Sequence, residues 1–175
     1  MLFYTQTIVI VGRNGIMVAE SGVKWMKVGD KASFLGEYRH NIDAKNRLII
    51  PAKFRDSLSS TFYVTKGLDG CLAVYTEESW AQQVEQLSKL PQTNRKARQY
   101  IRSITSKAQE SSLDSQGRLQ LPQYLIDIAE IEKECVIVGV SDYFEIWSLA
   151  KWDAFDQEAA DDFESDAEDL TEYLK

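Results

Sequence analysis

Histidine and cysteine are almost missing from this chain, which has one histidine and two cysteines among 175 residues. Cys71 and Cys135 are isolated in the sequence, and His40 has no partner at a metal-ligand spacing. Disulfide frameworks and metal sites need clustered cysteine or histidine, so we expect neither of them. The sequence also contains no readable nucleophile–base pair and no glycine-rich phosphate loop. We therefore expect no metal, no cofactor and no enzymatic activity.

Long hydrophobic runs are missing as well. No apolar run approaches the roughly 18 residues that a membrane-spanning helix needs. The apolar run at 7–11 is short and no basic residue precedes it, which argues against a signal peptide. We therefore expect a cytoplasmic protein that makes no contact with a membrane.

Negative charge is abundant, but it is gathered at one end of the chain. The formal net charge is −7. Residues 153–172 contain ten acidic residues and no basic one, whereas residues 34–152 contain equal numbers of acidic and basic residues. The distribution of charge matters more than its sum. A neutral body with an acidic tail can still bind phosphate if its basic side chains cluster.

One pattern occurs twice in the chain. Residues 43–51 and 114–122 both read Asp, three residues, Arg-Leu, two residues, Pro, at an offset of 71 residues. Asn46 and Gly117 occupy the same position in the two copies, and these residue types enter a left-handed turn at least cost. The pattern therefore predicts two matched tight turns, each of which holds an Asp and an Arg.

The likeness between the two copies extends beyond the turns. At an offset of 72, residues of the same type coincide at three positions, Val64 with Val136, Gly67 with Gly139 and Trp80 with Trp152. Runs rich in β-branched and aromatic residues flank the turns and predict strands. The proline that ends each pattern suits the start of a short helix. We interpret the chain as a duplicated strand–turn–strand–helix–strand–strand unit.

This duplication predicts an α+β fold that is rich in β-structure. The two modules are expected at 34–80 and 110–152, with a helical spacer at 81–109 between them. A helix and the acidic tail follow at 153–175. Residues 1–33 show no clear periodicity, which predicts a loosely attached or disordered extension.

The longer helices have recognisable starts. Thr76 and Ser148 are residue types that cap helix N-termini, and a further helix is expected to begin near Asn94. After the first of these caps, a helical spacing predicts one apolar face made by Trp80, Val84 and Leu87. Beyond the apolar positions of the last helix, the acidic tail is expected to fray.

The doubled Asp-x-x-(Gly/Asn)-Arg-Leu-x-(Leu/Ile)-Pro pattern, with a Phe-Leu-Gly start at Phe34 and a helical spacer, resembles the bacterial MraZ family. The resemblance covers about 34–163 and implies two tandem swapped-hairpin modules of the AbrB class. It implies a transcriptional regulator, expected to be a repressor, that binds double-stranded DNA at short direct repeats. These repeats lie upstream of the division and cell-wall gene cluster that contains the regulator's own gene. It further implies a ring-shaped homo-oligomer, an octamer or a dodecamer, associated with the nucleoid.

Carried onto this sequence, the family's DNA-contacting loop falls on 43–47 and 114–118. Arg47 and Arg118 match the arginines of the motif, and Lys45 matches the basic position before the turn. Gln116 stands where the second loop would have a basic residue, which predicts a weaker phosphate contact there.

Residues 1–33 have no counterpart in the resemblance. We interpret this extension as the product of a wrongly assigned start codon, with part of the operator translated. Detection of Met1 or Leu2 as the N-terminus of the native protein would contradict that hypothesis.

Two interpretations of the loops remain open at this point. Arginine presents a rigid fork that can bridge phosphate or grip guanine, which favours DNA contacts by Arg47 and Arg118. Asp43 and Asp114 would then shape the turns by accepting backbone N–H groups, together with Asn46 and Gly117. The alternative is that each Asp–Arg pair only stabilises its hairpin and makes no contact with DNA.

Two further alternatives concern charge outside the loops. The run from Arg95 to Lys107 holds five basic residues and no acidic one. It can be a solvated face, a secondary contact with phosphate, or a surface that pairs with the acidic tail. The rival function is an AbrB-like protein-interaction or antitoxin module whose acidic tail mimics nucleic acid.

Overall fold

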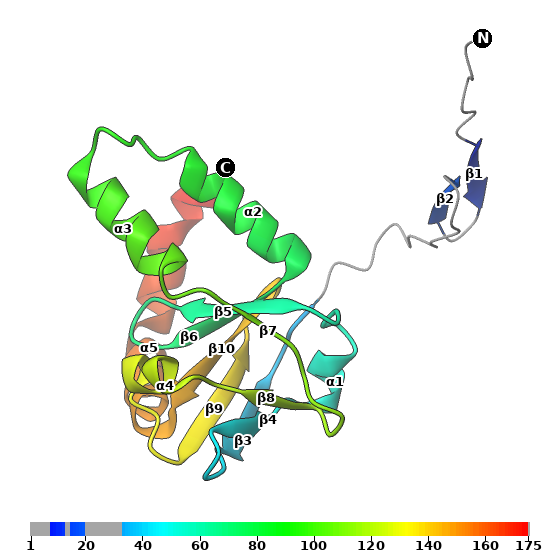
Figure 1. Ribbon diagram of the computed structural model, residues 1–175. Helices are drawn as coiled ribbons and strands as arrows, with labels where there is room; N and C mark the ends of the chain where they lie inside the picture. The colour runs from blue at the N-terminus through cyan, green and yellow to red at the C-terminus, as the bar shows by residue number, and fades with distance from the viewer. Residues whose placement is uncertain (1–7, 13–14, 20–32, 175) are drawn as a thin grey trace. The chain divides into compact units, whose positions relative to one another are not determined.

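The computed structural model describes residues 8–12, 15–19 and 33–174 of the chain (Figure 1). Residues 1–31 form one unit and residues 32–175 form another. In the first unit, β1 (Ile8–Gly12) and β2 (Gly15–Ala19) pair as an antiparallel ribbon. The rest of the predicted extension lies outside the described residues, so its disorder and its origin stay predictions.

The second unit is built on a six-stranded antiparallel sheet in the order β3-β9-β10-β6-β5-β7. The first repeat supplies β3 (Glu37–Asn41), β5 (Phe62–Lys66) and β6 (Leu72–Thr76). The second repeat supplies β7 (Gln109–Ser111), β9 (Glu134–Gly139) and β10 (Tyr143–Ser148). A separate two-stranded ladder joins β4 (Arg47–Ile49) to β8 (Arg118–Gln120).

The strands of the two repeats are exchanged. The first strand of each repeat pairs with a later strand of the other, β3 with β9 and β7 with β5. In the ladder Leu48 lies opposite Leu119, which is the same position of the other repeat, so the register is symmetric about this pair. The structure therefore confirms the predicted α+β, β-rich fold and shows that the two modules share one sheet.

One hydrophobic core serves both repeats. The rings of Phe34, Phe54 and Phe144 meet with centroids 5.1–5.2 Å apart, and all three side chains are fully buried. Leu48 and Leu119, the central pair of the ladder, are buried in the same cluster. Phe54 comes from the first repeat and Phe144 from the second, so each repeat completes the core of the other.

The described residues also form five α-helices (Figure 1), which are α1 (Ala52–Arg55), α2 (Glu77–Ser88), α3 (Arg95–Thr105), α4 (Gln123–Ala129) and α5 (Leu149–Asp169). Thr76 accepts a hydrogen bond from the N–H of Ser79, as its capping role predicts, and Asn94 accepts from Lys96 and Ala97. Ser148 is the N-cap residue of α5, but its side chain makes no capping bond. Val84 is exposed, so the predicted apolar face of α2 is incomplete.

The prediction that the acidic tail frays is wrong. Helix α5 runs to Asp169 and the short 3₁₀ helix η1 (Leu170–Leu174) follows it. The segment of α5 contains no glycine or proline, and five of its 21 residues are alanine, the strongest helix former. None of the helices in the described part of the chain is both long and apolar enough to cross a membrane.

Candidate nucleic-acid interface

The first repeated loop is a tight turn organised by one carboxylate. Oδ1 of Asp43 accepts hydrogen bonds from the backbone N–H groups of Lys45 at 2.8 Å and Arg47 at 3.0 Å. The Asp43 carbonyl accepts from the N–H of Asn46 at 2.9 Å, and Asn46 has a φ of +60°. Asparagine tolerates this left-handed conformation better than most residues, so the turn forms as the sequence predicts.

The second loop repeats the hydrogen bonds by which the aspartate of the first loop shapes its turn. Oδ1 of Asp114 accepts from the N–H groups of Gln116 at 2.9 Å and Arg118 at 3.0 Å. Gly117 takes the left-handed position with a φ of +74°, and its N–H donates to the Asp114 carbonyl at 2.9 Å. Asp43, Asp114, Asn46 and Gly117 therefore lie where a turn-shaping role requires them.

Each loop also holds its arginine against its aspartate. The Nε of Arg47 donates to Oδ2 of Asp43 at 2.7 Å, and the Nε of Arg118 donates to Oδ2 of Asp114 at 2.7 Å. The side-chain hydrogen bond from Arg47 lowers the pKa of Asp43 to about 2. The pKa of Asp114 is also lowered, first by the backbone N–H of Arg118 and then by its side chain.

The Asp–Arg pair is therefore present in both loops, and it leaves part of each guanidinium accessible. A guanidinium has five N–H donors, of which the aspartate engages only the Nε side in loop 114–118. Side-chain exposure is 27% for Arg47 and 23% for Arg118. This pair fixes the direction of each arginine side chain, so the side chain loses less conformational entropy when it contacts a ligand.

The two loops are joined through the β4–β8 ladder. Arg47 lies opposite Gln120, and Arg118 lies opposite Ile49, so the loops enter the ladder from opposite ends. The N–H of Leu121 donates to the Asn46 carbonyl at 2.9 Å, and the N–H of Ile50 donates to the Gly117 carbonyl at 3.1 Å. The structure thus places Arg47 and Arg118 on one ladder, and the other residues predicted for the site lie in the turns that lead into its two strands (Figure 1).

Two glutamines that the sequence did not reveal brace the first loop. The Nε2 of Gln120 donates to the Lys45 carbonyl at 2.9 Å. The Nδ2 of Asn46 donates to the Oε1 of Gln123 at 3.0 Å. Both glutamines belong to the second repeat, so no pattern local to the first loop could have identified them.

Arg55 packs against Gly117 in the second loop. A Cβ on Gly117 would lie 2.4 Å from Nη1 of Arg55 and 2.6 Å from its Cδ, so a side chain there would displace Arg55. The matching position in the other loop, Asn46, reaches the shorter and uncharged Gln123 instead. No sequence pattern marks Arg55, because its contact with the second loop depends on the exchange of elements between repeats.

The loop tips differ in charge. Lys45 is exposed, and within the described residues it is in no ion pair, whereas Arg47 and Arg118 are each paired with an aspartate. Gln116, at the corresponding tip of the second loop, is exposed and neutral. After the two Asp–Arg pairs cancel, Lys45 gives loop 43–47 an excess of positive charge that loop 114–118 lacks.

His40 and the two cysteines take structural positions. His40 is half-buried in β3, and its carbonyl accepts from the Sγ of buried Cys135 at 3.4 Å. Burial raises the pKa of both Cys71 and Cys135. The described residues contain no group of three or more His, Cys, Asp or Glu side chains placed to hold a metal ion.

Comparison with known proteins divides the chain into two matched parts, with the boundary inside α3. A family model described as "MraZ protein, putative antitoxin-like" matches residues 33–103 and again residues 104–173. The transcriptional regulator MraZ of Ligilactobacillus salivarius is 49% identical over 140 residues, which cover 80% of this chain and 98% of the relative. The proteins of the same name from Lactiplantibacillus plantarum and Desulforamulus reducens are 48% and 47% identical, and the matches cover 99% of each.

Proposed function

This chain belongs to the MraZ family of transcriptional regulators, and we propose that it acts by binding double-stranded DNA through loops 43–47 and 114–118. In this proposal Lys45, Arg47 and Arg118 contact the DNA. Asp43, Asn46, Asp114 and Gly117 shape the turns that present them, and no cofactor or metal takes part.

The observation that carries the proposal is the duplication of one hydrogen-bonded turn around two oriented arginines. In each loop the aspartate accepts from the backbone N–H and the Nε of its arginine, and Asp43 also contacts Nη2 of Arg47 at 2.6 Å. An Asp–Arg pair with only a structural role needs no basic side chain in the turn, yet Lys45 is exposed there. An arginine fork can bridge phosphate oxygens or bind O6 and N7 of guanine in the major groove.

The proposed mode of binding is avidity. A single ladder offers few contacts, so one protomer would bind weakly. A ring-shaped homo-oligomer would present many equivalent ladders to direct repeats set about one helical turn apart. The proposed targets are repeats upstream of the protein's own gene in the division and cell-wall cluster, where the protein would act as a repressor in the nucleoid.

The test is an Arg47→Ala substitution, measured by gel shift on the protein's own upstream DNA. A well-placed arginine contact is worth about 1–3 kcal/mol, so we expect operator affinity to fall by about 10-fold or more at each binding ladder. Sedimentation should show an unchanged oligomer. The matched control is Lys89→Ala at the C-cap of α2, where Lys89 pairs with Glu85, and this variant should bind like the wild type. Retained affinity in the Arg47→Ala protein would overturn the assignment of this loop.

A further inference from the structure

Arg55, the last residue of α1, reaches the second loop from the other repeat. A Cβ on Gly117 would lie 2.6 Å from the Cδ and 2.9 Å from the Cζ of Arg55, so this side chain rests on the backbone of loop 114–118. Figure 1 also shows α1 beside the turn between β7 and β8. Because α1 belongs to the first repeat, the exchange of elements between the repeats brings a basic residue to this loop.

The charge of Arg55 is not balanced by any described residue. Arg47 and Arg118 each pair with an aspartate, but Arg55 forms no ion pair within the described part of the chain. Its Nε is buried and has no hydrogen-bond partner there. Buried polar groups are nearly always bonded, and an unbonded one costs free energy. Arg55 is therefore an unpaired cation held against a loop that is proposed to bind DNA.

Loop 114–118 lacks an unpaired base of its own. Gln116 occupies the position that Lys45 has in the first loop. The offset of 71 residues that relates the two loops carries Arg55 onto Ile126, which is buried. The first loop thus has an unpaired base in its own sequence, whereas the second loop receives one from α1. Each end of the β4–β8 ladder then has one excess positive charge.

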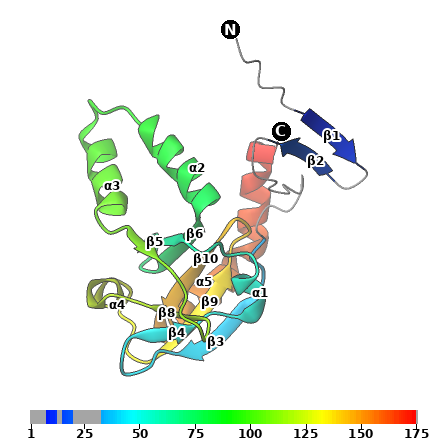
Figure 2. The same cartoon turned by 45° about the vertical axis from the view of Figure 1, so that its right-hand side comes forward.

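The bases of α3 are too far along the molecule to provide this charge. Figures 1 and 2 both show the α2–α3 hairpin at one end of residues 32–175, with the β3–β4 and β7–β8 turns at the other. A duplex held by loops 43–47 and 114–118 would lie away from α3. Helix α1 lies beside the second of these loops, so its base is the one within reach of the same duplex.

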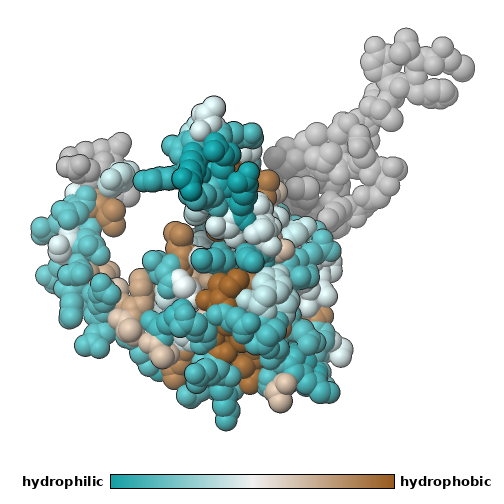
Figure 3. Space-filling model, turned by 60° about the vertical axis from the view of Figure 1, so that its left-hand side comes forward, coloured by the Kyte–Doolittle hydropathy of each residue, from teal (hydrophilic) through white to brown (hydrophobic). Residues whose placement is uncertain are grey.

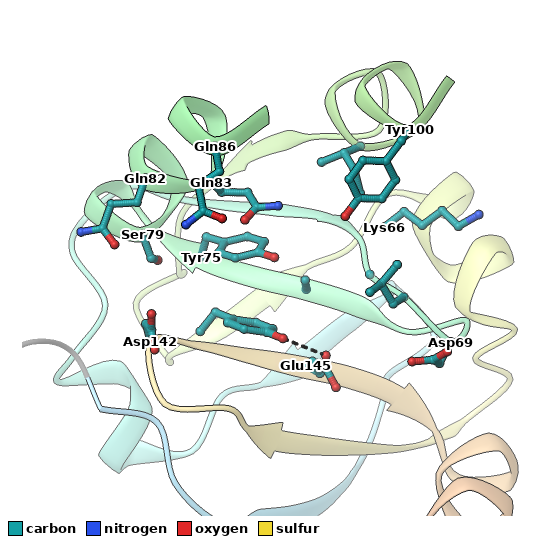
Figure 4. Close-up of a pocket in the computed structure, with 15 residues that line it drawn as sticks. Lys66, Asp69, Tyr75, Ser79, Gln82, Gln83, Gln86, Tyr100, Asp142 and Glu145 are labelled. Carbon is teal, nitrogen blue, oxygen red and sulfur yellow. Dashed lines mark hydrogen bonds between the residues drawn. The ribbon is translucent and has the colours of Figure 1, made fainter. Parts of the chain in front are cut away.

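Two acidic surfaces lie elsewhere on residues 32–175. Residues 153–169 of α5 include nine acidic ones, and the outer part of this helix stands apart from the body in Figure 3 as a mostly hydrophilic column. Asp69, Asp142 and Glu145 line a cavity of about 490 Å³ between the α2–α3 hairpin and the sheet (Figure 4). Carboxylates repel phosphate. Both surfaces therefore favour a duplex at the turns, on the side that holds Arg55.

We propose that Arg55 contacts a phosphate of the DNA bound at loop 114–118 and supplies the positive charge that this loop lacks. A guanidinium presents its N–H donors as a fixed fork that can bridge phosphate oxygens. Glycine at 117 leaves room for this fork against the loop. The inference rests on the proposed function of the two loops and adds to them a residue from outside both.

Arg55→Gln tests the contact, because it removes the charge and keeps a polar side chain. Affinity should fall on the protein's own upstream DNA and by a similar factor on an unrelated duplex, since a phosphate contact does not read sequence. Each phosphate contact adds about 0.9 to the slope of log affinity against log salt. The loss of affinity between 50 and 200 mM salt should therefore be about threefold smaller for each contact removed. Fluorescence anisotropy at the two salt concentrations measures both effects.

A second substitution separates charge from packing. Arg55→Gln/Gln116→Lys returns a base to this end of the ladder, at the tip of the loop, and should recover both the affinity and the salt dependence. A purely structural role of Arg55 predicts no recovery. Arg55→Lys keeps the charge and should keep most of the salt dependence, and circular dichroism should show a native fold in each variant.

Lys53→Gln is the matched control, because it removes the same charge from the same helix. Lys53 is exposed and lies two residues before Arg55, a spacing that places the two side chains on different faces of a helix. Its affinity and salt dependence should stay close to those of the wild type. Equal losses in Lys53→Gln and Arg55→Gln would overturn the contact, because they would show a general effect of charge.

Two further results would overturn the role of Arg55. They are unchanged affinity and salt dependence in Arg55→Gln, and no recovery in Arg55→Gln/Gln116→Lys. The Arg47→Ala gel shift tests the loops independently. If Arg47→Ala loses affinity and Arg55→Gln does not, the contact by Arg55 fails and the function of the loops stands. If Arg47→Ala keeps its affinity, the proposed function of the loops fails first.

Discussion

At the scale of single residues, two aspartates hold the proposed DNA-contacting arginines in place. Asp43 serves its loop by accepting from two backbone N–H groups and from the Arg47 side chain. These bonds stabilise the ionised carboxylate, so its pKa falls below its ordinary value of 3.8. The stabilisation is therefore present above that ordinary value and is lost as the pH falls through about 2.

Replacement of Arg47 should raise the pKa of Asp43 toward its ordinary value. In Arg47→Ala the largest cause of the lowered pKa is gone, so the midpoint should rise from about 2 toward 3.8. Carboxyl-carbon NMR titration measures this midpoint directly. Arg118→Ala, in the other loop, is the control that should leave Asp43 near its original value. An unshifted Asp43 midpoint in Arg47→Ala would mean that this side-chain bond does not form in solution.

The two left-handed positions should respond differently to substitution. Gly117→Ala adds a Cβ at a φ of +74° and 2.4 Å from Nη1 of Arg55. The left-handed conformation costs a non-glycine residue about 1–2 kcal/mol, so the free energy of unfolding should fall by at least that amount.

Asn46→Gly is the matched control for this change. It relieves the left-handed backbone but removes the bond to Gln123, so its effect on the free energy of unfolding should be small. Denaturant unfolding measures both proteins. Equal stability of Gly117→Ala and the wild type would contradict the expected cost of a Cβ in this turn.

At the scale of elements, helix capping separates two sites that look alike in the sequence. Thr76 accepts from the N–H of Ser79, whereas the Ser148 side chain makes no capping bond. Loss of an N-cap costs about 0.5–2 kcal/mol. Thr76→Ala should therefore lower the free energy of unfolding by that amount, and Ser148→Ala should lower it less. Thermal unfolding of both variants tests this, and the reverse order would contradict the assigned caps.

At the scale of the whole molecule, the exchange of strands makes the two repeats one cooperative unit. Phe54 of the first repeat packs on Phe144 of the second at 5.2 Å, and the central strands β6 and β10 come from different repeats. Neither repeat has a complete core of its own. Residues 32–175 should therefore unfold in one transition.

A core substitution tests this cooperativity. Phe54→Ala should destabilise by about 3–5 kcal/mol, as usual for a buried phenylalanine. Circular dichroism and tryptophan fluorescence should shift together, with a single midpoint. The exposed Leu68 provides the control, since Leu68→Ala removes little buried surface. Two separate transitions in the Phe54→Ala protein would show that the repeats fold independently.

The sequence by itself determined the features that depend on a few consecutive residues. The repeated turns follow from Asp43 and Asp114 with a left-handed residue three positions later, and the helix starts follow from Thr76 and Asn94. Each of these features is stabilised by bonds within about four residues, so its pattern is visible in one segment of the chain. The duplication was equally visible, because both copies lie in the same sequence.

Only the tertiary structure decided which strands pair and what surrounds the turns. The ladder of β4 with β8, the braces from Gln120 and Gln123, and the contact of Arg55 with Gly117 all join one repeat to the other. Such contacts are fixed by burial of a common core, and no local pattern encodes them. The sequence thus determined the two turns and their arginines, and the packing of the core placed them together on one ladder.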